Sequence, residues 1–410
     1  MYIDPGTGSM LFTILIGIIG ASIYSLKMLF IKLRFKLSGG KVKESDKKLP
    51  FVIFSDDKRY WNIFEPICRE MDKRGKDVVY MTASEDDAAL ECTYPHVKSM
   101  FIGKDNKAFA RLNFLNASVV LSTTPGLDVY QWKRSKQVDY YVHIPHAAND
   151  ITLYRMFGLD YYDAVLLSGE YQKNQIRKLE GMRGISEKEL VTVGIPYMDE
   201  MAERLKNAPA APEHERTILL APSWGTSAIL SVYGGKIIDV LLKTGYHVII
   251  RPHPQSFKSE KDMLDKLMKE YPDSDRLEWN RDTDNFEVLR RSDILISDFS
   301  GVIFDFALIY DKPIIYTDPK FDVSLYDHWW MNESLWTAEA LPKLGKMLDR
   351  DNMEDLKSLI DTCIESPEFA EGRRAVKAET WEHPGEGASL VADYLIKKYD
   401  EITSLEGGNK

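Results

Sequence analysis

Two histidines follow one of the apolar runs in the first half of the chain. Residues 141–146 read YVHIPH, so His143 closes the apolar run and His146 lies further into the turn behind it. An imidazole whose pKa is about 6.5 can take a proton from a hydroxyl group near neutral pH. We therefore interpret His146 as a candidate general base and expect His143 to point into the sheet. The alternative for each histidine is a structural hydrogen bond to a backbone carbonyl.

An arginine and a histidine alternate with prolines in the second half, where residues 249–254 read IIRPHP. Alternate residues of an extended segment project to the same side, so Arg251 and His253 are expected to face one way. The prolines stiffen the backbone that carries them. A guanidinium and an imidazole together suit a phosphate or a diphosphate leaving group, on which negative charge develops. The alternative for Arg251 is an ion pair with a buried aspartate.

Small polar residues interrupt another apolar run, because residues 294–305 read ILISDFSGVIFD. This pattern predicts a strand, a tight turn and a helix whose first backbone N–H groups are free. Such a helix start binds anions, so Ser297, Ser300 and the backbone at Gly301 are candidates to hold a diphosphate. Asp298 is a candidate to orient the histidine of the second half or to bond a ribose hydroxyl. The alternative is an ordinary helix cap.

Two further residues complete the candidate set. Ser223 lies in the segment 219–225, LLAPSWG, whose small residues after a strand suit one wall of a nucleotide pocket. Asp305 comes in the helix after the serine-rich turn, where a functional role and a capping or packing role are both open.

All of these turns have to be positioned by strands, and the hydrophobic pattern predicts two series of them separated by helical stretches. The predicted strands are Phe51–Phe54, Asp77–Thr82, Val97–Ile102, Ser118–Ser122, Val138–His143, Ala164–Leu167 and Val191–Ile195, then Thr217–Ala221, His247–Arg251, Leu277–Trp279, Ile294–Ser297 and Pro313–Thr317. Apolar strands that alternate with helices favour parallel sheets, whose ligands bind at the carboxyl ends of the strands. We therefore predict two tandem α/β units with a cleft between them. Neither GxGxxG nor GxxxxGK[ST] occurs, so the usual dinucleotide and P-loop fingerprints are absent.

Shifts in composition divide the chain. We predict an N-terminal segment 1–37, a polar linker 38–50, a first α/β domain 51–205, a second linker 206–216, a second α/β domain 217–395 and a polar tail 396–410. Both linkers lack apolar periodicity.

The N-terminal segment has the pattern of a membrane anchor. No charge occurs from Met10 to Leu26, and the apolar character continues after Lys27 to Ile31, which predicts a spanning helix at about 10–31. Basic residues follow this run rather than precede it, so the pattern differs from a signal peptide. By the positive-inside rule we expect a single-pass protein of the cell membrane whose catalytic domains are cytoplasmic.

Charge and cysteine usage exclude some classes of protein. The formal net charge of −10 argues against a nucleic-acid-binding protein, which needs a basic face. The three cysteines, Cys68, Cys92 and Cys363, are scattered and have no metal-ligand spacing. We expect neither a disulfide framework nor a metal site.

The ordered series of these motifs resembles the CDP-glycerol glycerophosphotransferase family, which comprises teichoic-acid polymerases and primases. The resemblance runs over about residues 51–395 and is most specific where Arg-Pro-His-Pro (251–254) is followed by Ser-Asp-Phe-Ser-Gly (297–301), Phe-Asp (304–305) and Lys-Pro (312–313). The segment 385–389, GEGAS, resembles the family's Gly-x-Ala-Ser segment. Around the N-terminal histidine the family usually has Trp-His-Gly, where this chain has Pro145, His146 and Ala147.

The resemblance implies a GT-B fold, in which a Rossmann-like acceptor domain faces a Rossmann-like nucleotide-donor domain, and it implies no metal and no other cofactor. His146 would deprotonate an acceptor hydroxyl, which attacks the β-phosphorus of CDP-glycerol or a related CDP-alditol and releases CMP. Arg251 and His253 would stabilise the departing phosphate. Ser297, Asp298 and Ser300 would hold the diphosphate.

The expected function is thus that of a membrane-anchored transferase in cell-envelope polymer synthesis. The expected partners are a nucleotide-activated small-molecule donor, a lipid-linked or glycan acceptor and the membrane. Two alternatives remain open. One is a GT-B glycosyltransferase that uses a nucleotide sugar, and the other is an inactive, membrane-tethered scaffold.

Overall fold

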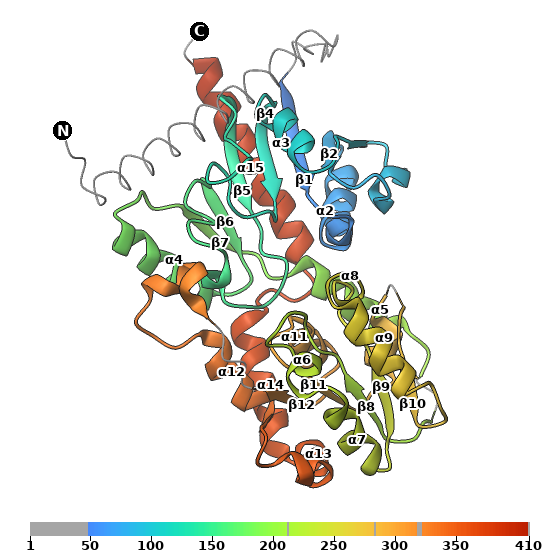
Figure 1. Cartoon of the computed structure of the whole chain (residues 1–410). Helices are drawn as coiled ribbons and strands as arrows, with labels where there is room; N and C mark the ends of the chain where they lie inside the picture. The colour runs from blue at the N-terminus through green and yellow to red at the C-terminus, as the bar shows by residue number, and fades with distance from the viewer. Residues whose placement is uncertain (1–47, 211–212, 283, 318–321, 409–410) are drawn as a thin grey trace, which may run out of the picture. The chain divides into compact units, whose positions relative to one another are not determined.

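The computed structural model describes residues 48–210, 213–282, 284–317 and 322–408 (Figure 1). The predicted anchor 1–37, with its spanning helix, and most of the linker 38–50 lie outside these residues. Within the described part of the chain, no helix has both the length and the apolar content that a bilayer crossing requires. The body described below begins at Leu49.

The first half of this body is built on a seven-stranded sheet in the order β3-β2-β1-β4-β5-β6-β7. The strands are Leu49–Ser55 (β1), Val78–Thr82 (β2), Val97–Phe101 (β3), Asn116–Ser122 (β4), Gln137–His143 (β5), Ala164–Leu167 (β6) and Glu189–Thr192 (β7). Every pairing in the sheet is parallel. The predicted α/β class is therefore confirmed for this half.

The second half repeats the arrangement with a six-stranded parallel sheet in the order β10-β9-β8-β11-β12-β13. The strands are Thr217–Leu220 (β8), His247–Ile250 (β9), Leu277–Trp279 (β10), Ile294–Ser297 (β11), Ile314–Thr317 (β12) and Gly345–Leu348 (β13). The sequence pattern did not predict β13. It is an edge strand in which Lys346 and Met347 are exposed, so no apolar run marks it.

Helices cover both faces of each sheet. Their bounds are Trp61–Lys73 (α2), Asn106–Leu112 (α3), Glu170–Arg183 (α4), Pro196–Asn207 (α5), Ile229–Tyr233 (α6), Gly235–Lys243 (α7), Ser256–Ser259 (α8), Lys261–Glu270 (α9), Phe286–Arg290 (α10), Val302–Phe304 (α11), Trp336–Leu344 (α12), Leu356–Glu365 (α13), Pro367–Thr380 (α14) and Gly387–Gly408 (α15). Alternate strand residues enter opposite cores, as Phe51 and Ile53 do on one face of β1 and Val52 and Phe54 on the other. Burial of each such side chain stabilises the fold by about 1.5–3 kcal/mol.

The two halves exchange their last helices. In α5, Met198 and Met201 pack into a core of the second sheet, although α5 follows the strands of the first. In α15, Val391 and Leu395 pack into a core of the first sheet, along which Figure 1 shows this helix running. The structure thus differs from the predicted boundaries at 205 and 395. An amphipathic helix does not reveal which sheet it will cover, so the sequence did not mark these exchanges. The helix α15 also continues past residue 395 into the predicted polar tail 396–410.

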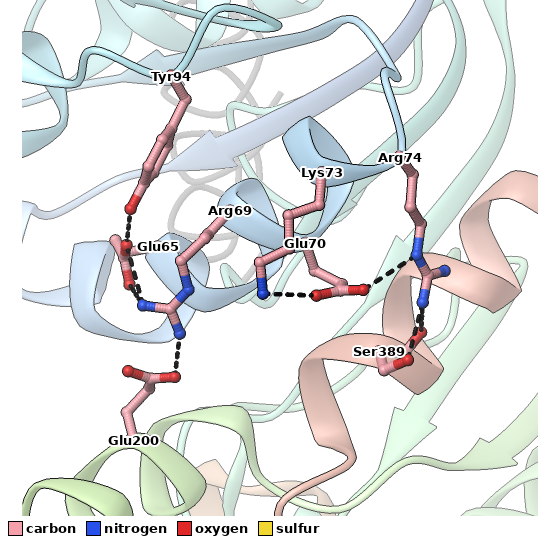
Figure 2. Close-up of polar contacts among 8 residues, drawn as sticks. All are labelled: Glu65, Arg69, Glu70, Lys73, Arg74, Tyr94, Glu200 and Ser389. Atoms are coloured by element: carbon pink, nitrogen blue, oxygen red, sulfur yellow. Dashed lines mark hydrogen bonds and ion pairs between the residues drawn. The ribbon is translucent and has the colours of Figure 1, made fainter.

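Charged residues on α2 and at its C-cap connect this helix to both exchanged helices (Figure 2). Arg69 pairs with Glu65 of the same helix at 3.3 Å and with Glu200 of α5. Arg74 pairs with Glu70 at 3.1 Å and donates to the Ser389 hydroxyl of α15 at 2.8 Å. Half-exposed ion pairs contribute at most about 1 kcal/mol each, but a network that joins three helices fixes their mutual position.

A buried carboxylate in the loop after β5 connects the first half to the second. Asp150, which is only 2% exposed, accepts the Trp336 backbone N–H at 2.7 Å and the Thr337 backbone N–H at 2.9 Å. The Thr337 hydroxyl and the Gln175 side-chain amide, the latter at 3.0 Å, also donate to it. These bonds satisfy the free N–H groups at the first turn of α12.

We predict that Asp150→Ala lowers the free energy of unfolding by about 3 kcal/mol, because it removes a helix cap and leaves buried N–H groups without acceptors. Urea denaturation measures this change. The matched control is Asp265→Ala on α9, which removes an exposed carboxylate paired with Lys261 and should cost less than about 1 kcal/mol. Equal urea midpoints for the Asp150 variant and the unmodified protein would show that these hydrogen bonds do not stabilise the fold.

Candidate functional site

The candidate site lies at the carboxyl ends of strands at or next to the point where the strand order of each sheet reverses. The chain builds β1, β2 and β3 outward in one direction and then returns to place β4 on the other side of β1, and β8 to β11 repeat this order. Loops after the strands on either side of such a switch point diverge, and ligands of open α/β sheets bind there. The turns that carry the predicted residues follow β5, β8, β9 and β11.

His146 is half-buried in the turn after β5. Its Nδ1 atom lies 3.3 Å from the Thr123 hydroxyl, and its ring lies 5.1 Å from the ring of Tyr60. Burial, followed by the positive charge of Arg59, lowers the pKa of His146 to about 4. The imidazole is therefore neutral at neutral pH and able to accept a proton.

His143 has a structural environment. It is fully buried, its Nε2 atom lies 3.0 Å from the Tyr154 hydroxyl, and its ring packs edge-on against Tyr154 and Tyr162. Burial, followed by the nearby His146, lowers the pKa of His143 to about 3. This histidine points into the protein, as the sequence predicted.

Two charged residues that we did not predict, Asp56 and Arg59, lie in the turn after β1, and the charge of Arg59 acts on His146. The charge of Arg59 lowers the pKa of His146 and also that of His253 in the other half, in each case after the larger effect of burial. Asp56 is exposed to solvent, yet the surrounding protein raises its pKa by desolvation. The sequence did contain a signal for Asp56 and Arg59, because both follow the apolar run 51–54. The other candidates were identified from the same kind of position after a predicted strand.

His253 and Arg251 follow β9 and have different partners. The Gln255 backbone N–H donates to Nδ1 of His253 at 3.1 Å, so the neutral imidazole carries its proton on Nε2. The His253 ring lies 6.5 Å from the Trp224 ring. Arg251 donates to the side chain of Asn280 rather than to a buried aspartate. Both candidates are half-exposed, which leaves them accessible to a ligand.

Ser297 and Asp298 build the turn after β11. The Ser297 hydroxyl donates to the Ala221 carbonyl at 2.6 Å. Asp298 is fully buried and accepts the backbone N–H groups of Ser223 at 2.9 Å, Phe299 at 2.7 Å and Ile229 at 3.0 Å. These bonds tie the loop after β8 to the turn after β11. Both side chains therefore stabilise the backbone of the turn. Direct contact with a ligand stays a prediction for Ser297, for Asp298 and for the buried Ser223.

Ser300 and Gly301 are the accessible part of the same turn. Ser300 is half-exposed and Gly301 is exposed. A side chain at Gly301 would place its Cβ 3.8 Å from the Cβ of Ala147, the residue after His146. The serine-rich turn of the second half and the histidine turn of the first half therefore lie against each other.

Asp305 lies in the first position of a single π-helical turn, Asp305–Ile309, that continues α11. Burial raises the pKa of its carboxyl to about 7. At neutral pH a substantial fraction of this carboxyl is protonated and can donate a hydrogen bond. Single π-turns within helices are frequent at functional sites, and a role in donor binding stays a prediction for Asp305.

Two family-like motifs have structural roles here. Lys312 donates to the backbone carbonyls of Arg290 at 2.7 Å and Ser292 at 2.6 Å, which caps the end of α10, and burial lowers its pKa to about 8. In the segment 385–389, the backbone N–H groups of Gly385 and Gly387 donate to Asp199 of α5 at 2.7 and 3.0 Å. A side chain at Gly387 would place its Cβ only 2.7 Å from that carboxylate.

Comparison with known proteins adds independent information. The family described as "CDP-Glycerol:Poly(glycerophosphate) glycerophosphotransferase" matches residues 155–329. A teichoic acid glycerol-phosphate primase from Bacillus spizizenii is 25% identical over 178 residues, which are 40% of this chain and 42% of the primase. The match thus spans less than half of that relative.

Solved structures share the fold over most of the chain. The wall teichoic acid polymerase TagF, in a structure soaked with CDPG, has a TM-score of 0.58 at 18% identity and covers 93% of this chain and 97% of its own. A UDP-GlcNAc 2-epimerase from Methanocaldococcus jannaschii has a TM-score of 0.56 at 13% identity and covers 86% of this chain and 100% of its own. The fold is an α/β, GT-B-like arrangement with parallel sheets. The matching segment 155–329 and the sequence relative show that this part of the chain is similar to the CDP-glycerol glycerophosphotransferase family.

Proposed function

We propose that this protein transfers glycerol phosphate, or a related alditol phosphate, from a CDP-alditol to a hydroxyl group of a lipid-linked or glycan acceptor in cell-envelope polymer synthesis. The observation that carries the proposal is the contact between the two turns. Ala147, next to the neutral His146, lies against Gly301 of the serine-rich turn. A base for the acceptor and backbone donors for a diphosphate are thereby held together.

In the proposed reaction, His146 takes the proton of the acceptor hydroxyl at Nε2, while its Nδ1–H faces the Thr123 hydroxyl. The acceptor oxygen forms a bond to the β-phosphorus, and the bond between that phosphorus and the bridging oxygen breaks. CMP leaves with the electron pair. Phosphoryl transfer passes through a loose transition state, so positioning and charge stabilisation matter more than the strength of the base.

The departing CMP carries the negative charge that develops. Nε2–H of His253 and the guanidinium of Arg251 are the donors that would stabilise it, since Gln255 and Asn280 already orient these two side chains. Backbone N–H groups at Ser300 and Gly301 would hold the diphosphate. The proposed chemistry uses no metal.

The proposal includes the membrane. Residues 10–26 carry no charge and are followed by basic residues, so we propose that they anchor the protein with its catalytic domains in the cytoplasm.

A panel of nucleotides tests the donor. We predict that CDP-glycerol, CDP-ribitol or CMP raises the melting temperature of the full chain, because a ligand present at about 100 times its Kd adds roughly 2.7 kcal/mol to stability. UDP-glucose and UDP-N-acetylglucosamine are the matched controls and should have no effect. A shift with a uridine sugar alone would reject the proposal and favour the glycosyltransferase alternative.

We predict that His146→Ala lowers kcat by about 10²–10⁴-fold and leaves the Kd for CDP-glycerol nearly unchanged, because the base acts on the acceptor. Single-turnover kinetics and titration calorimetry measure the two quantities. His96→Ala is the control, since it removes an exposed histidine that pairs with Asp77. Normal turnover in the His146 variant would remove this residue from the mechanism.

Removal of residues 1–37 tests the anchor. We predict that the shortened protein stays in the supernatant when membranes are sedimented, whereas the full chain sediments with them. Tight sedimentation of the shortened protein would show that another surface binds the membrane.

A further inference from the structure

Arg59 has donors that no described protein group uses. Its Nε atom donates to Asp57 at 3.0 Å, and its guanidinium lies 5.7 Å from the centre of the Tyr60 ring. Among the residues that the structure describes, neither terminal nitrogen of Arg59 donates to a protein acceptor. The side chain is 57% exposed. Arginine presents its N–H donors as a planar fork that matches two oxygens of a phosphate, and here the outer part of that fork is free.

The turn that carries Arg59 is held rigidly. Asp57 accepts the backbone N–H of Arg59 at 2.9 Å as well as its Nε–H, so one carboxylate fixes both the turn and the side chain. The helix α2 begins at Trp61, directly after this turn. The ion pair of Arg69 with Glu200 and the hydrogen bond of Arg74 to Ser389 connect α2 to α5 and α15 (Figure 2).

This position is next to the reacting groups of both halves. The guanidinium stacks on Tyr60, the Tyr60 ring lies 5.1 Å from that of His146, and the following residue, Ala147, lies against Gly301. Arg59 is also close enough to His253 for its charge to lower the pKa of that imidazole. Hence Arg59 brings positive charge from the first half to the side of the proposed base, within electrostatic reach of His253.

We propose that Arg59 binds the β-phosphate of the nucleotide donor, which is the group transferred. This inference rests on the proposed function and adds a residue from the first half to the donor site. The β-phosphate has to meet the acceptor oxygen beside His146, so it is the phosphate that Arg59 can reach from the same edge of the sheet. The α-phosphate leaves with CMP and remains with the groups of the second half.

Titration calorimetry of the full chain with CDP-glycerol and with CMP tests this assignment. CMP lacks the β-phosphate, so Arg59→Gln should weaken the binding of CDP-glycerol by about tenfold or more and leave the binding of CMP unchanged. Arg59→Lys keeps the charge without the fork and should give an intermediate affinity for CDP-glycerol. Lys58→Gln is the matched control, because it removes an exposed cation of the same turn that pairs with Asp86.

The outcomes separate the inference from the function on which it rests. Equal affinity of the Arg59→Gln variant and the unmodified protein for CDP-glycerol would overturn the role of Arg59 alone. An equal loss for CDP-glycerol and CMP would also overturn it, since that pattern indicates a structural defect. If the unmodified protein binds neither nucleotide, the proposed function fails and the inference fails with it.

Discussion

The Asp150 carboxylate at the start of α12 is the interaction on which the arrangement of the site depends. Asp150 lies four residues after His146 in the same loop, and its acceptors are used by backbone and side-chain donors of the second half. A buried carboxylate that lost these donors would be strongly destabilising, so the loop has little freedom to move away. The histidine turn is consequently held against the serine-rich turn, although the two belong to different sheets.

Two other carboxylates, the buried Asp298 and the half-buried Asp199, also join separate segments. Asp298 joins the loops after β8 and β11 through backbone N–H groups, and Asp199 joins α5 to the start of α15. Burial raises the pKa of both carboxyls, while the hydrogen bonds they accept act in the opposite direction. Thus motif residues that look like ligands can instead position the backbone that does the binding. Lys312 is a further example, because its ammonium group donates hydrogen bonds to backbone carbonyls at the end of α10.

The electrostatics of the site follow from partial burial. His146 and His253 both have lowered pKa values, chiefly through desolvation and then through Arg59, so both imidazoles are neutral near pH 7. A neutral His146 can accept a proton, and a neutral His253 with its proton on Nε2 can donate a hydrogen bond. In the proposed reaction, two positive groups, Arg59 and Arg251, face the charge of the diphosphate. This division of roles suits a transfer reaction in which a negative leaving group departs.

The hydrophobic pattern alone predicted most of the strands and the turns behind them, because short apolar runs ended by small or polar residues are local signals. It predicted neither β13, whose central residues are exposed, nor the exchange of α5 and α15, since an amphipathic helix can cover either sheet. Likewise, residue types identified His146, Arg251 and His253, whereas only the folded chain showed that Asp298 and Lys312 are used by the backbone. The position of Arg59 after the apolar run 51–54 was a weak signal, and its nearness to the histidines of both halves appeared only in the folded chain. The sequence determined which polar groups lie at the ends of the strands. The tertiary structure decided which of these groups stay accessible to a ligand, because the others form hydrogen bonds with distant segments of the chain.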